Sequence, residues 1–173
     1  MRLIIEKDYE QLAEWAAEHV IKRINDFNPT PQKKFVLGLP TGSSPIGMYK
    51  KLIQAYNEKR VSFKNVVTFN MDEYVGLPVE HPESYHSFMY NNLFRHIDCP
   101  DQNIHILNGN APDLEAECAN YEMMINEADG IDLFVCGVGV DGHNDVNEPG
   151  ATLSSRTRQK TLRTETRMVN SRF

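Results

Sequence analysis

The chain alternates between two patterns of hydrophobic residues, continuous apolar runs and helical periodicities. The continuous runs, which are typical of strands buried on both faces, lie at residues 35–39, 66–69, 104–107 and 131–136. Helical spacing of apolar residues begins near Asp8, Pro45, Ser84 and Leu114. This alternation predicts an α/β fold, with a Rossmann-like parallel sheet of about four or five strands and helices on both faces.

Two helix starts carry capping signals. Asp8, with Gln11 three residues later, predicts an N-cap, and the inward face of that helix is expected to include Leu12. In the second helix, Ser44 is expected to cap the first turn, with Pro45 at the first helical position. The second helix is therefore expected to begin directly after the loop that ends the first strand.

The length of 173 residues is enough for one globular core, so residues 1–173 are predicted to form a single α/β domain. After Pro149 the apolar periodicity fades, although a parallel sheet needs helices over both of its faces. We therefore expect a domain that is incomplete at its C-terminus.

The composition indicates where the protein works. The opening residues, MRLIIE, hold too short an apolar run for a signal peptide, and no segment approaches the ~18 apolar residues of a membrane span. We expect a cytoplasmic protein without a membrane partner.

The three cysteines, Cys99, Cys118 and Cys136, are an odd number with wide spacing, which predicts neither a disulfide framework nor a zinc site. They are expected to be reduced packing residues.

The net charge of −6 is unevenly distributed along the chain. Residues 151–173 hold six cationic side chains and a single carboxylate, that of Glu165. Because the rest of the chain is strongly acidic, general binding of nucleic acid is not expected. The basic segment is explained either by a local anion or by a flexible, solvated end.

The loops that follow the predicted strands are where a site is expected, because ligands of an open parallel sheet bind beyond the carboxyl ends of its strands. The first such loop, residues 39–45, has the sequence LPTGSSP. Gly42 would let backbone N–H groups approach an anion at the start of the next helix. The loop lacks the spacing and the lysine of a P-loop, so ATP is not implied. A phosphate cradle and an ordinary turn both remain open.

The second loop, FNMDEY at residues 69–74, places Asp72 and Glu73 just past a strand end. Because successive side chains there point in opposite directions, one of the two carboxylates can face the crevice. A partly desolvated carboxylate in that position could have its pKa raised into the range that suits moving a proton on and off carbon. The alternative is a solvated acidic turn.

The third loop, residues 137–149, has the sequence GVGVDGHNDVNEP. Its glycines match the dinucleotide fingerprint, but that fingerprint must open a helix, which Pro149 and the following glycine would break at once. This short loop suggests instead an acid–base cluster of Asp141, His143, Asp145 and Glu148, in which a carboxylate orients the imidazole. Such side chains could also hold a metal, but their spacing matches no recognised metal site, so no metal is predicted.

Together these loops resemble those of the glucosamine-6-phosphate deaminase family, and the resemblance covers all 173 residues. It rests on the stretches LGLPTG, FNMDEYVGLP, HPESY, DGH, NEP and SRTR, in that order. The resemblance implies conversion of glucosamine 6-phosphate and water to fructose 6-phosphate and ammonium, on a Rossmann-like sheet and with no cofactor. A sister enzyme, such as a lactonase or a pentose-phosphate isomerase, is the alternative that fold analogy offers.

The resemblance also implies catalytic roles. His143, oriented by Asp141 and Glu148, would open the pyranose ring by moving a proton between the C1 hydroxyl and the ring oxygen. Asp72 would then be the base that removes the C2 proton and returns a proton at C1. These four side chains would carry the whole acid–base chemistry.

Binding residues follow from the same resemblance. The substrate phosphate would be held by the first loop, through Thr41, Gly42, Ser43 and Ser44. Arg172 would close over that phosphate. Family members are homo-oligomers, hexamers among them, that respond to N-acetylglucosamine 6-phosphate at a second site. Arg158, Lys160 and Thr161 resemble the residues that bind the phosphate of this activator.

The chain departs from the family in the third loop. The family's residues between the histidine and the asparagine are apolar, usually Ile-Ala-Phe, whereas this chain has Asn144-Asp145-Val146. The added carboxylate would raise one or more pKa values in the acid–base cluster, because like charges disfavour joint ionisation. A further lysine of the family's phosphate site would lie beyond Phe173. A non-catalytic phosphosugar-binding or subunit-interacting form is therefore the alternative to an active enzyme.

Overall fold

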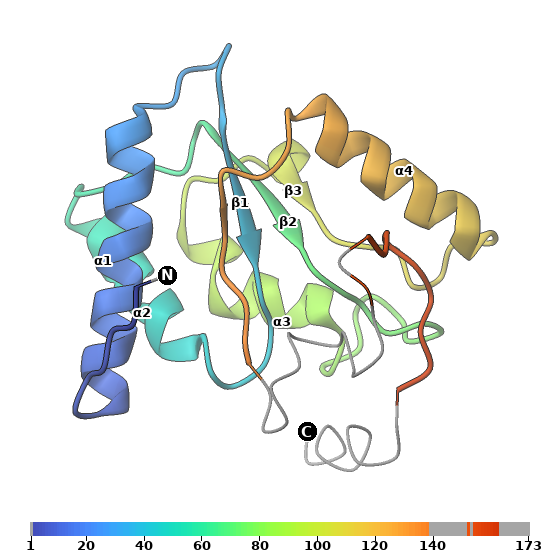
Figure 1. Ribbon diagram of the computed structural model, residues 1–173, viewed down its shortest axis with the longest axis horizontal. Coiled ribbons are helices and arrows are strands. Elements are labelled where there is room, and N and C mark those ends of the chain that lie inside the picture. Colours follow the sequence, from blue (N-terminus) through green and yellow to red (C-terminus); the bar gives the residue numbers. More distant parts are fainter. Residues whose placement is uncertain (1, 139–151, 153, 163–173) are drawn as a thin grey trace.

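The computed structural model describes residues 2–138, 152 and 154–162, and Figure 1 labels its elements. The helices are α1 (Tyr9–Phe27), α2 (Ile46–Asn57), α3 (Tyr85–Asn92) and α4 (Leu114–Glu127). The strands are β1 (Phe35–Leu39), β2 (Val66–Asn70), β3 (Ile104–His105) and β4 (Leu133–Phe134). Two short 3-10 helices, η1 (Phe94–His96) and η2 (Asp101–Asn103), lie between α3 and β3. The predicted alternation of strands and helices is confirmed.

Within the described residues, the four strands form one parallel sheet in the order β3-β2-β1-β4. β1 and β2 pair along their full length, from Phe35 with Val66 to Leu39 with Asn70. The chain places β2 and β3 on one side of β1 and then crosses back to place β4 on the other side. This is the order of a Rossmann-like fold, so the predicted fold class is confirmed. Its ligand crevice lies beyond the carboxyl ends of the strands, near this reversal.

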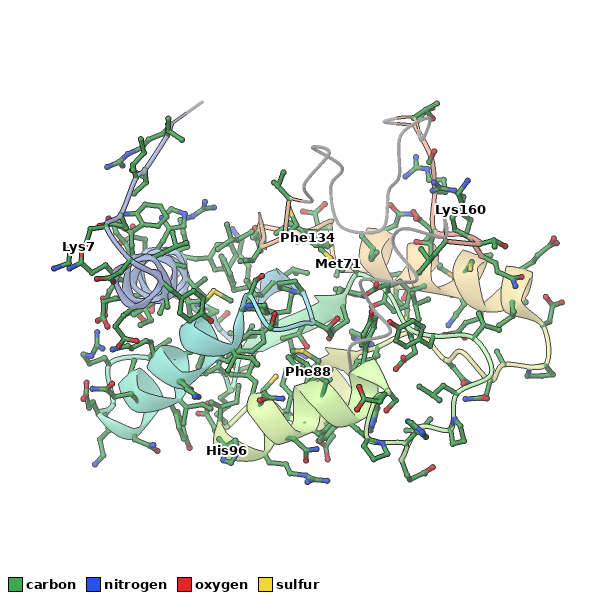
Figure 2. All side chains as sticks on the ribbon, turned by 90° about the horizontal axis from the view of Figure 1, so that it is seen from below. Lys7, Met71, Phe88, His96, Phe134 and Lys160 are labelled. Atoms are coloured by element: carbon green, nitrogen blue, oxygen red, sulfur yellow. The ribbon has the colours of Figure 1, made fainter. Side chains whose placement is uncertain are left out.

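The two faces of the sheet are covered by different helices. Because alternate residues of a strand point to opposite faces, Leu37 of β1 packs in the core formed with α1, α2 and α3, whereas Val36 packs with Tyr121 of α4. In Figure 2, Phe88 of α3 and Phe134 of β4 lie on opposite sides of the sheet. The prediction of helices on both faces is confirmed.

The longest described helix, α1, has 19 residues and is amphipathic, and no described helix is long and apolar enough to cross a bilayer. Asp8 caps α1 as predicted, because its carboxylate accepts a hydrogen bond of 2.9 Å from Gln11 N. The predicted inward face is wrong at Leu12, which is 47% exposed. The close approach of α1 and α2 favours smaller residues: a Cβ added at Gly47 would lie 2.7 Å from Cβ of Ala13. The buried residues of α1 are Ala13, Ala17, Val20, Ile21 and Ile24.

Two of the strands, β3 and β4, are shorter than the apolar runs predict, and a side chain forms a hydrogen bond with the backbone beside each of them. Where β2 and β3 end, the Tyr121 hydroxyl donates to the carbonyl oxygens of Asn70 at 2.7 Å and His105 at 3.0 Å. Beside β4, the Asp132 carboxylate accepts a hydrogen bond of 2.9 Å from Val36 N. The residues after each short strand form loops that line the site described next.

Candidate functional site

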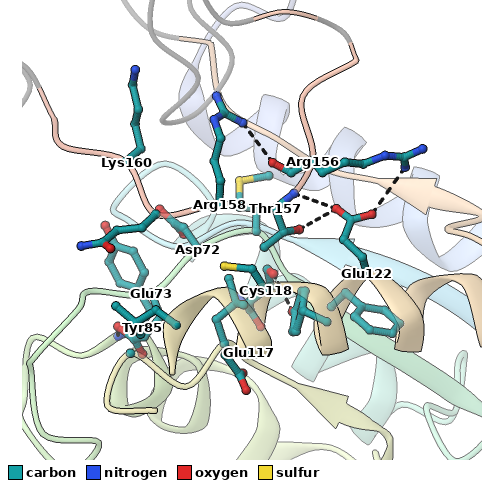
Figure 3. Close-up of a pocket in the computed structure, with 18 of the residues that line it drawn as sticks. Asp72, Glu73, Tyr85, Glu117, Cys118, Glu122, Arg156, Thr157, Arg158 and Lys160 are labelled. Carbon is teal, nitrogen blue, oxygen red and sulfur yellow. Dashed lines mark hydrogen bonds and ion pairs between the residues drawn. The ribbon is translucent and has the colours of Figure 1, made fainter. Parts of the chain in front are cut away.

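A cavity of 580 Å³ opens at the carboxyl ends of β2 and β3, beside α4. Its lining includes the apolar or aromatic side chains of Phe69, Tyr121 and Ile125, together with the loop 71–75 that follows β2. Figure 3 shows another of its boundaries, where residues 155–160 cross over α4. The cavity therefore lies at the edge of the sheet where this fold binds its ligands.

The two adjacent carboxylates after β2, Asp72 and Glu73, have different surroundings. Glu73 turns to the start of α3, where it accepts hydrogen bonds from the backbone N–H groups of Tyr85 at 3.0 Å and His86 at 2.9 Å. A carboxylate there satisfies N–H groups of the first turn and complements the positive end of the helix. Asp72 lines the cavity, and its Oδ1 atom is buried. Glu73 lines the same cavity, but both of its carboxylate oxygens are engaged by the start of α3.

Tyr85 connects the cavity with the loop that follows β1. Its side chain lines the cavity, and its hydroxyl makes hydrogen bonds with Thr41 and Tyr74. Burial raises the pKa of Tyr85, and the nearby carboxylate of Asp72 raises that pKa further. Because a raised pKa keeps the hydroxyl protonated at neutral pH, Tyr85 stays a neutral hydrogen-bonding group beside Asp72.

Tyr121 of α4 supports the same strand end from the other side of the sheet. Its ring packs edge-to-face on Phe69, with centroids 5.5 Å apart, and only 3% of the residue is exposed. Its hydroxyl is bonded to the carbonyl of Asn70, two residues before Asp72. Burial raises the pKa of Tyr121, and Asp72 adds to that rise. The backbone that leads to Asp72 is therefore held by a buried, neutral hydroxyl.

The loop after β1 is fixed by two tyrosine hydroxyls. That of Tyr49 donates to the carbonyl of Pro40, and that of Tyr9 donates to the carbonyl of Ser44 at 2.9 Å. The Tyr9 hydroxyl also accepts a hydrogen bond of 2.8 Å from Gly47 N. The prediction that Ser44 caps α2 is therefore wrong: no side chain of the loop caps this helix, because Tyr9 from α1 supplies the acceptor.

Gly42 gives this loop its sharp turn. Its φ of 89° is a left-handed conformation that glycine adopts without strain, and no atom lies within 4 Å of a Cβ built there. Thr41 and Gly42 are half-buried, whereas Ser43 and Ser44 are exposed. None of the four lines the 580 Å³ cavity, to which the loop is linked through Tyr85. A phosphate cradle at this loop stays a prediction.

Residues 154–162, here called the strap, pass over α4 (Figure 3). Thr157 donates from its backbone N at 2.8 Å and from Oγ1 at 2.7 Å to the same oxygen of Glu122, Oε1. Arg158 and Lys160 of the strap line the cavity, whereas Thr161 is exposed and does not. Two of the three predicted activator-binding residues therefore lie at the same cavity as the predicted catalytic base.

Four predicted site residues lie outside the described residues: Asp141, His143, Glu148 and Arg172. The triplet Asn144-Asp145-Val146 lies outside them as well. Cys136, five residues before Asp141, lines the cavity. The roles of the four residues stay predictions from the family resemblance.

The described histidines, cysteines and carboxylates form no group of three or more that is placed to hold a metal ion. The cysteines differ in burial: Cys99 is buried, Cys118 is half-buried and Cys136 is exposed. Burial raises the pKa of the Cys118 thiol, and the neighbouring carboxylates, Glu117 first, raise it further. The predicted packing role therefore fits Cys99 and is wrong for Cys136.

Sequence reasoning assigns no role to three residues of this site, Tyr85, Tyr121 and Glu122. Tyr85 belongs to the HPESY stretch that carries the family resemblance. Tyr121 lies at helical spacing from Leu114, Cys118 and Ile125, so the sequence held a signal for both tyrosines. Glu122 had none, because its partner Thr157 is 35 residues away in the sequence.

Comparisons with known proteins give this site a family context. Residues 7–145 match the family described as glucosamine-6-phosphate isomerases/6-phosphogluconolactonase. A glucosamine-6-phosphate deaminase from Phocaeicola vulgatus is 66% identical to this chain over all 173 residues. One from Mannheimia succiniciproducens is 61% identical over the same length. The chain covers 66% and 65% of these two proteins, so it spans about two thirds of the length of the relatives it matches.

Solved structures share the fold. The structure of a monomeric glucosamine-6-phosphate deaminase matches with a TM-score of 0.93 at 40% identity, over 99% of this chain and 69% of that chain. A 6-phosphogluconolactonase from Thermotoga maritima matches with a TM-score of 0.66 at 23% identity, over 83% of this chain and 62% of that chain. At the lower identity the likeness shows a common fold alone.

Proposed function

The chain belongs to the family of glucosamine-6-phosphate isomerases and 6-phosphogluconolactonases, and from this premise we propose that it converts glucosamine 6-phosphate and water to fructose 6-phosphate and ammonium. The observation that carries the proposal is Asp72, whose carboxylate lines the 580 Å³ cavity at the carboxyl end of β2. Relatives that are named glucosamine-6-phosphate deaminases, at up to 66% identity, support the same reaction.

The first step opens the sugar ring. His143, held by Asp141 and Glu148, moves a proton from the C1 hydroxyl to the ring oxygen, which breaks the C1–O5 bond and leaves a C1 aldehyde. A carboxylate hydrogen-bonded to an imidazole favours its protonated form and so makes it a better base. The support for this step is the sequence order of the family, since all three residues lie outside the described part of the chain.

The second step moves a proton between carbons. Asp72 removes the C2 proton while the aldehyde oxygen takes up a proton from water, which gives an enolamine. A proton is then returned at C1 and the amine nitrogen loses one, which leaves a C2 imine. Water adds to this imine, and ammonia leaves to give the C2 ketone of fructose 6-phosphate. The neutral hydroxyls of Tyr85 and Tyr121 suit this step, because they lie near the Asp72 carboxylate and add no competing negative charge.

The substrate phosphate has its place at the loop after β1. Thr41, Gly42, Ser43 and Ser44 lie at the end of the strand next to β2, and Arg172 would supply the charge. Two tyrosine hydroxyls fix this loop, and Thr41 is hydrogen-bonded to Tyr85 of the cavity. A fixed anchor of this kind orients the sugar relative to Asp72 and so lowers the entropy cost of reaching the transition state.

Incubation of the purified full chain with glucosamine 6-phosphate tests the proposal. Ammonium and fructose 6-phosphate should appear in equal amounts, because each turnover releases one of each. The absence of both products at high protein concentration would reject the activity for this chain. Hydrolysis of 6-phosphogluconolactone in place of deamination would assign the chain to the other branch of its family.

A thermal-shift titration with glucosamine 6-phosphate separates an enzyme from the non-catalytic alternative, a phosphosugar-binding form. A ligand that binds only the folded state raises Tm in proportion to the logarithm of its concentration. A rise of Tm without turnover would support the non-catalytic form, whereas turnover supports the deaminase.

Further properties of the family complete the proposal. We expect the protein in the cytoplasm, as a homo-oligomer activated by N-acetylglucosamine 6-phosphate, with Arg158, Lys160 and Thr161 contacting the activator's phosphate. Arg158 and Lys160 line the cavity that is assigned above to the substrate, so the support for a separate activator site is the family resemblance of residues 158–161. One solved relative is described as monomeric, so assembly is the property of this set that size-exclusion chromatography should test first.

A further inference from the structure

The strap, residues 154–162, is joined to α4 through one carboxylate. Both oxygens of Glu122 accept from it: Oε1 from the backbone N and the hydroxyl of Thr157, at 2.8 Å and 2.7 Å, and Oε2 from the Arg156 guanidinium at 3.4 Å. Figure 3 draws these three contacts as dashed lines that converge on the Glu122 side chain. One of them is made by backbone, so the carboxylate fixes the path of the chain as well as the position of side chains.

Glu122 is less exposed than the carboxylates of the other described ion pairs. Its side chain is 24% exposed, whereas both side chains of the Lys22–Asp26 pair are more than half exposed. Hydrogen bonds to an ionised acceptor are about twice as strong as neutral ones, and reduced solvent access strengthens them further. We call this contact, in which the Glu122 carboxylate binds Thr157 and Arg156 of the strap, the latch.

The helix that carries Glu122 is itself anchored. The preceding residue, Tyr121, is 3% exposed and bonds the strand ends at Asn70 and His105. Glu122 is therefore displayed from a turn of α4 whose position is fixed against the sheet. A latch on a fixed turn holds the strap at a defined place above the cavity.

The pKa of Glu122 agrees with this role. Burial acts to raise it, but hydrogen bonds from Thr157 and the Arg156 charge outweigh burial and lower it below the ordinary glutamate value. The carboxylate is therefore ionised at neutral pH, as a charge-assisted latch requires.

The residues that follow the latch are the cationic ones. Arg158 is the next residue after Thr157, and Lys160 lies two residues further on; both line the cavity. The Arg158 guanidinium also donates to the carbonyl of Arg156 at 3.1 Å, which ties it to the latched part of the strap. The location of the Thr157 backbone therefore decides where these two charges are presented.

We propose that Glu122 is a positioning residue, which latches the strap at Thr157 and thereby places Arg158 and Lys160 to receive the phosphate of a sugar-phosphate ligand. The inference rests on the proposed function, because that function supplies the ligand, and it adds a residue that makes no contact with the ligand itself. Electrostatics and the loss of the latch predict opposite changes in the affinity of Glu122→Ala for an anion. Removal of a negative charge near two cations should by electrostatics alone strengthen anion binding, whereas loss of the latch should weaken it.

The test compares four variants of the full chain. Glu122→Ala removes the latch, Thr157→Val removes one of its hydrogen bonds without changing any charge, and Thr157→Ser restores the hydroxyl. Glu127→Ala, at the exposed end of α4, removes a carboxylate without touching the strap and is the matched control. Two quantities are measured: amide hydrogen exchange of residues 155–160 without ligand, and the Kd for N-acetylglucosamine 6-phosphate by calorimetry.

Exchange of these amides should become about tenfold faster in Glu122→Ala, and the Kd should rise about tenfold, as expected for losing a charge-assisted hydrogen bond. Thr157→Val should show the same changes to a smaller extent, and Thr157→Ser and Glu127→Ala should match the parent chain. Unchanged exchange in Glu122→Ala would overturn the latch. Faster exchange with an unchanged or tighter Kd would overturn the positioning role alone. A parent chain that fails to bind the probe would reject the proposed activator site, a result distinct from both.

Discussion

On one face of the sheet, three helices bury the side chains of β1 and β2, and the largest core residues, such as Tyr49 and Leu52, are 0% exposed. On the other face, α4 is the described helix that covers Val36, Val67 and Phe69, and Phe134 at the edge is 43% exposed. Figure 2 shows this asymmetry, with Phe88 of α3 on the thickly covered side and Phe134 and Lys160 on the other. The predicted catalytic base and the strap both border the cavity beside α4.

The two faces of the sheet contribute differently to stability and to the site. The thickly covered face provides most of the buried apolar area, which is the main source of stability, and it fixes the strands whose ends carry the site. The thinly covered face leaves room for a cavity and for polar side chains that a dense core would exclude. Mutations on the two faces should therefore change the free energy of unfolding and the activity by different amounts. The expected loss of stability is largest for the variants of the buried core and smallest for those at the cavity.

A pair of truncations compares the faces directly. Leu52→Ala, in the core of the covered face, should lower the free energy of unfolding by about 3 kcal/mol, because it leaves a cavity that the surrounding helices cannot fill. Ile125→Ala, at the half-open cavity, should cost about 1 kcal/mol, because its side chain is already partly hydrated. Urea unfolding of both variants measures the two values. Equal losses would show that the faces contribute alike.

The contact between β1 and β4 is a narrower test of the thin face. A Cβ added at Gly38 would lie 2.6 Å from ring atoms of Phe134, so Gly38→Ala must displace that ring and should cost about 2 kcal/mol. Gly137→Ala is the matched control, because a Cβ there meets nothing within 4 Å. Equal unfolding midpoints for the two variants would contradict the importance of this approach.

Lowering the pH should release the strap before the sheet unfolds. The pKa of Glu122 is lower in the folded protein than in the unfolded chain, so its contribution is complete above about pH 4.5 and is lost as pH falls through the lower folded value. The charged and thiol groups around it are Arg156, Glu117 and Cys118. Amide exchange of residues 155–158 should be constant from pH 7 to 5, after correction for intrinsic rates, and should accelerate below pH 4 in the parent chain only. The same acceleration in Glu122→Ala would contradict this assignment.

The sequence predicted the architecture well and the strand and helix ends less well. Continuous apolar runs are a sufficient signal for β1 and β2, which are buried on both faces along their full length. The same signal overestimates β3, where the Tyr121 hydroxyl binds the carbonyl of the last strand residue, His105, and β4, whose neighbours Asp132 and Val135 keep backbone hydrogen bonds to β1. A contact between residues far apart in sequence decides these ends, and no local pattern records it.

Contacts between residues far apart in the sequence also decide the surroundings of the site residues. Asp72 was predicted from its place after a strand, and both Asp72 and Glu73 line the cavity, but the oxygens of Glu73 are engaged by the first turn of α3. The predicted cap at Ser44 failed because Tyr9, from a helix 35 residues earlier, supplies the acceptor to α2. Contacts of this range follow from the packing of α1 on α2, which a sequence pattern does not specify.

The smallest effect on stability should accompany the largest effect on activity. Asp72→Asn keeps the size of a side chain that lies at a cavity wall rather than in the core, so Tm should change by no more than a few degrees. The amide is not a base, so deamination should fall by about 100- to 10,000-fold, the usual contribution of a positioned general base. Glu80→Gln, an exposed carboxylate on the same segment, is the matched control and should retain the parent rate.

The rate of ammonium release from glucosamine 6-phosphate by Asp72→Asn, relative to Glu80→Gln, decides whether Asp72 is the base. A loss of at least about 100-fold in the first variant alone, with the Tm of both unchanged, is the predicted result. Equal rates in the two variants would contradict the assignment of Asp72 as the base, and with it the placement of the chemistry at this cavity.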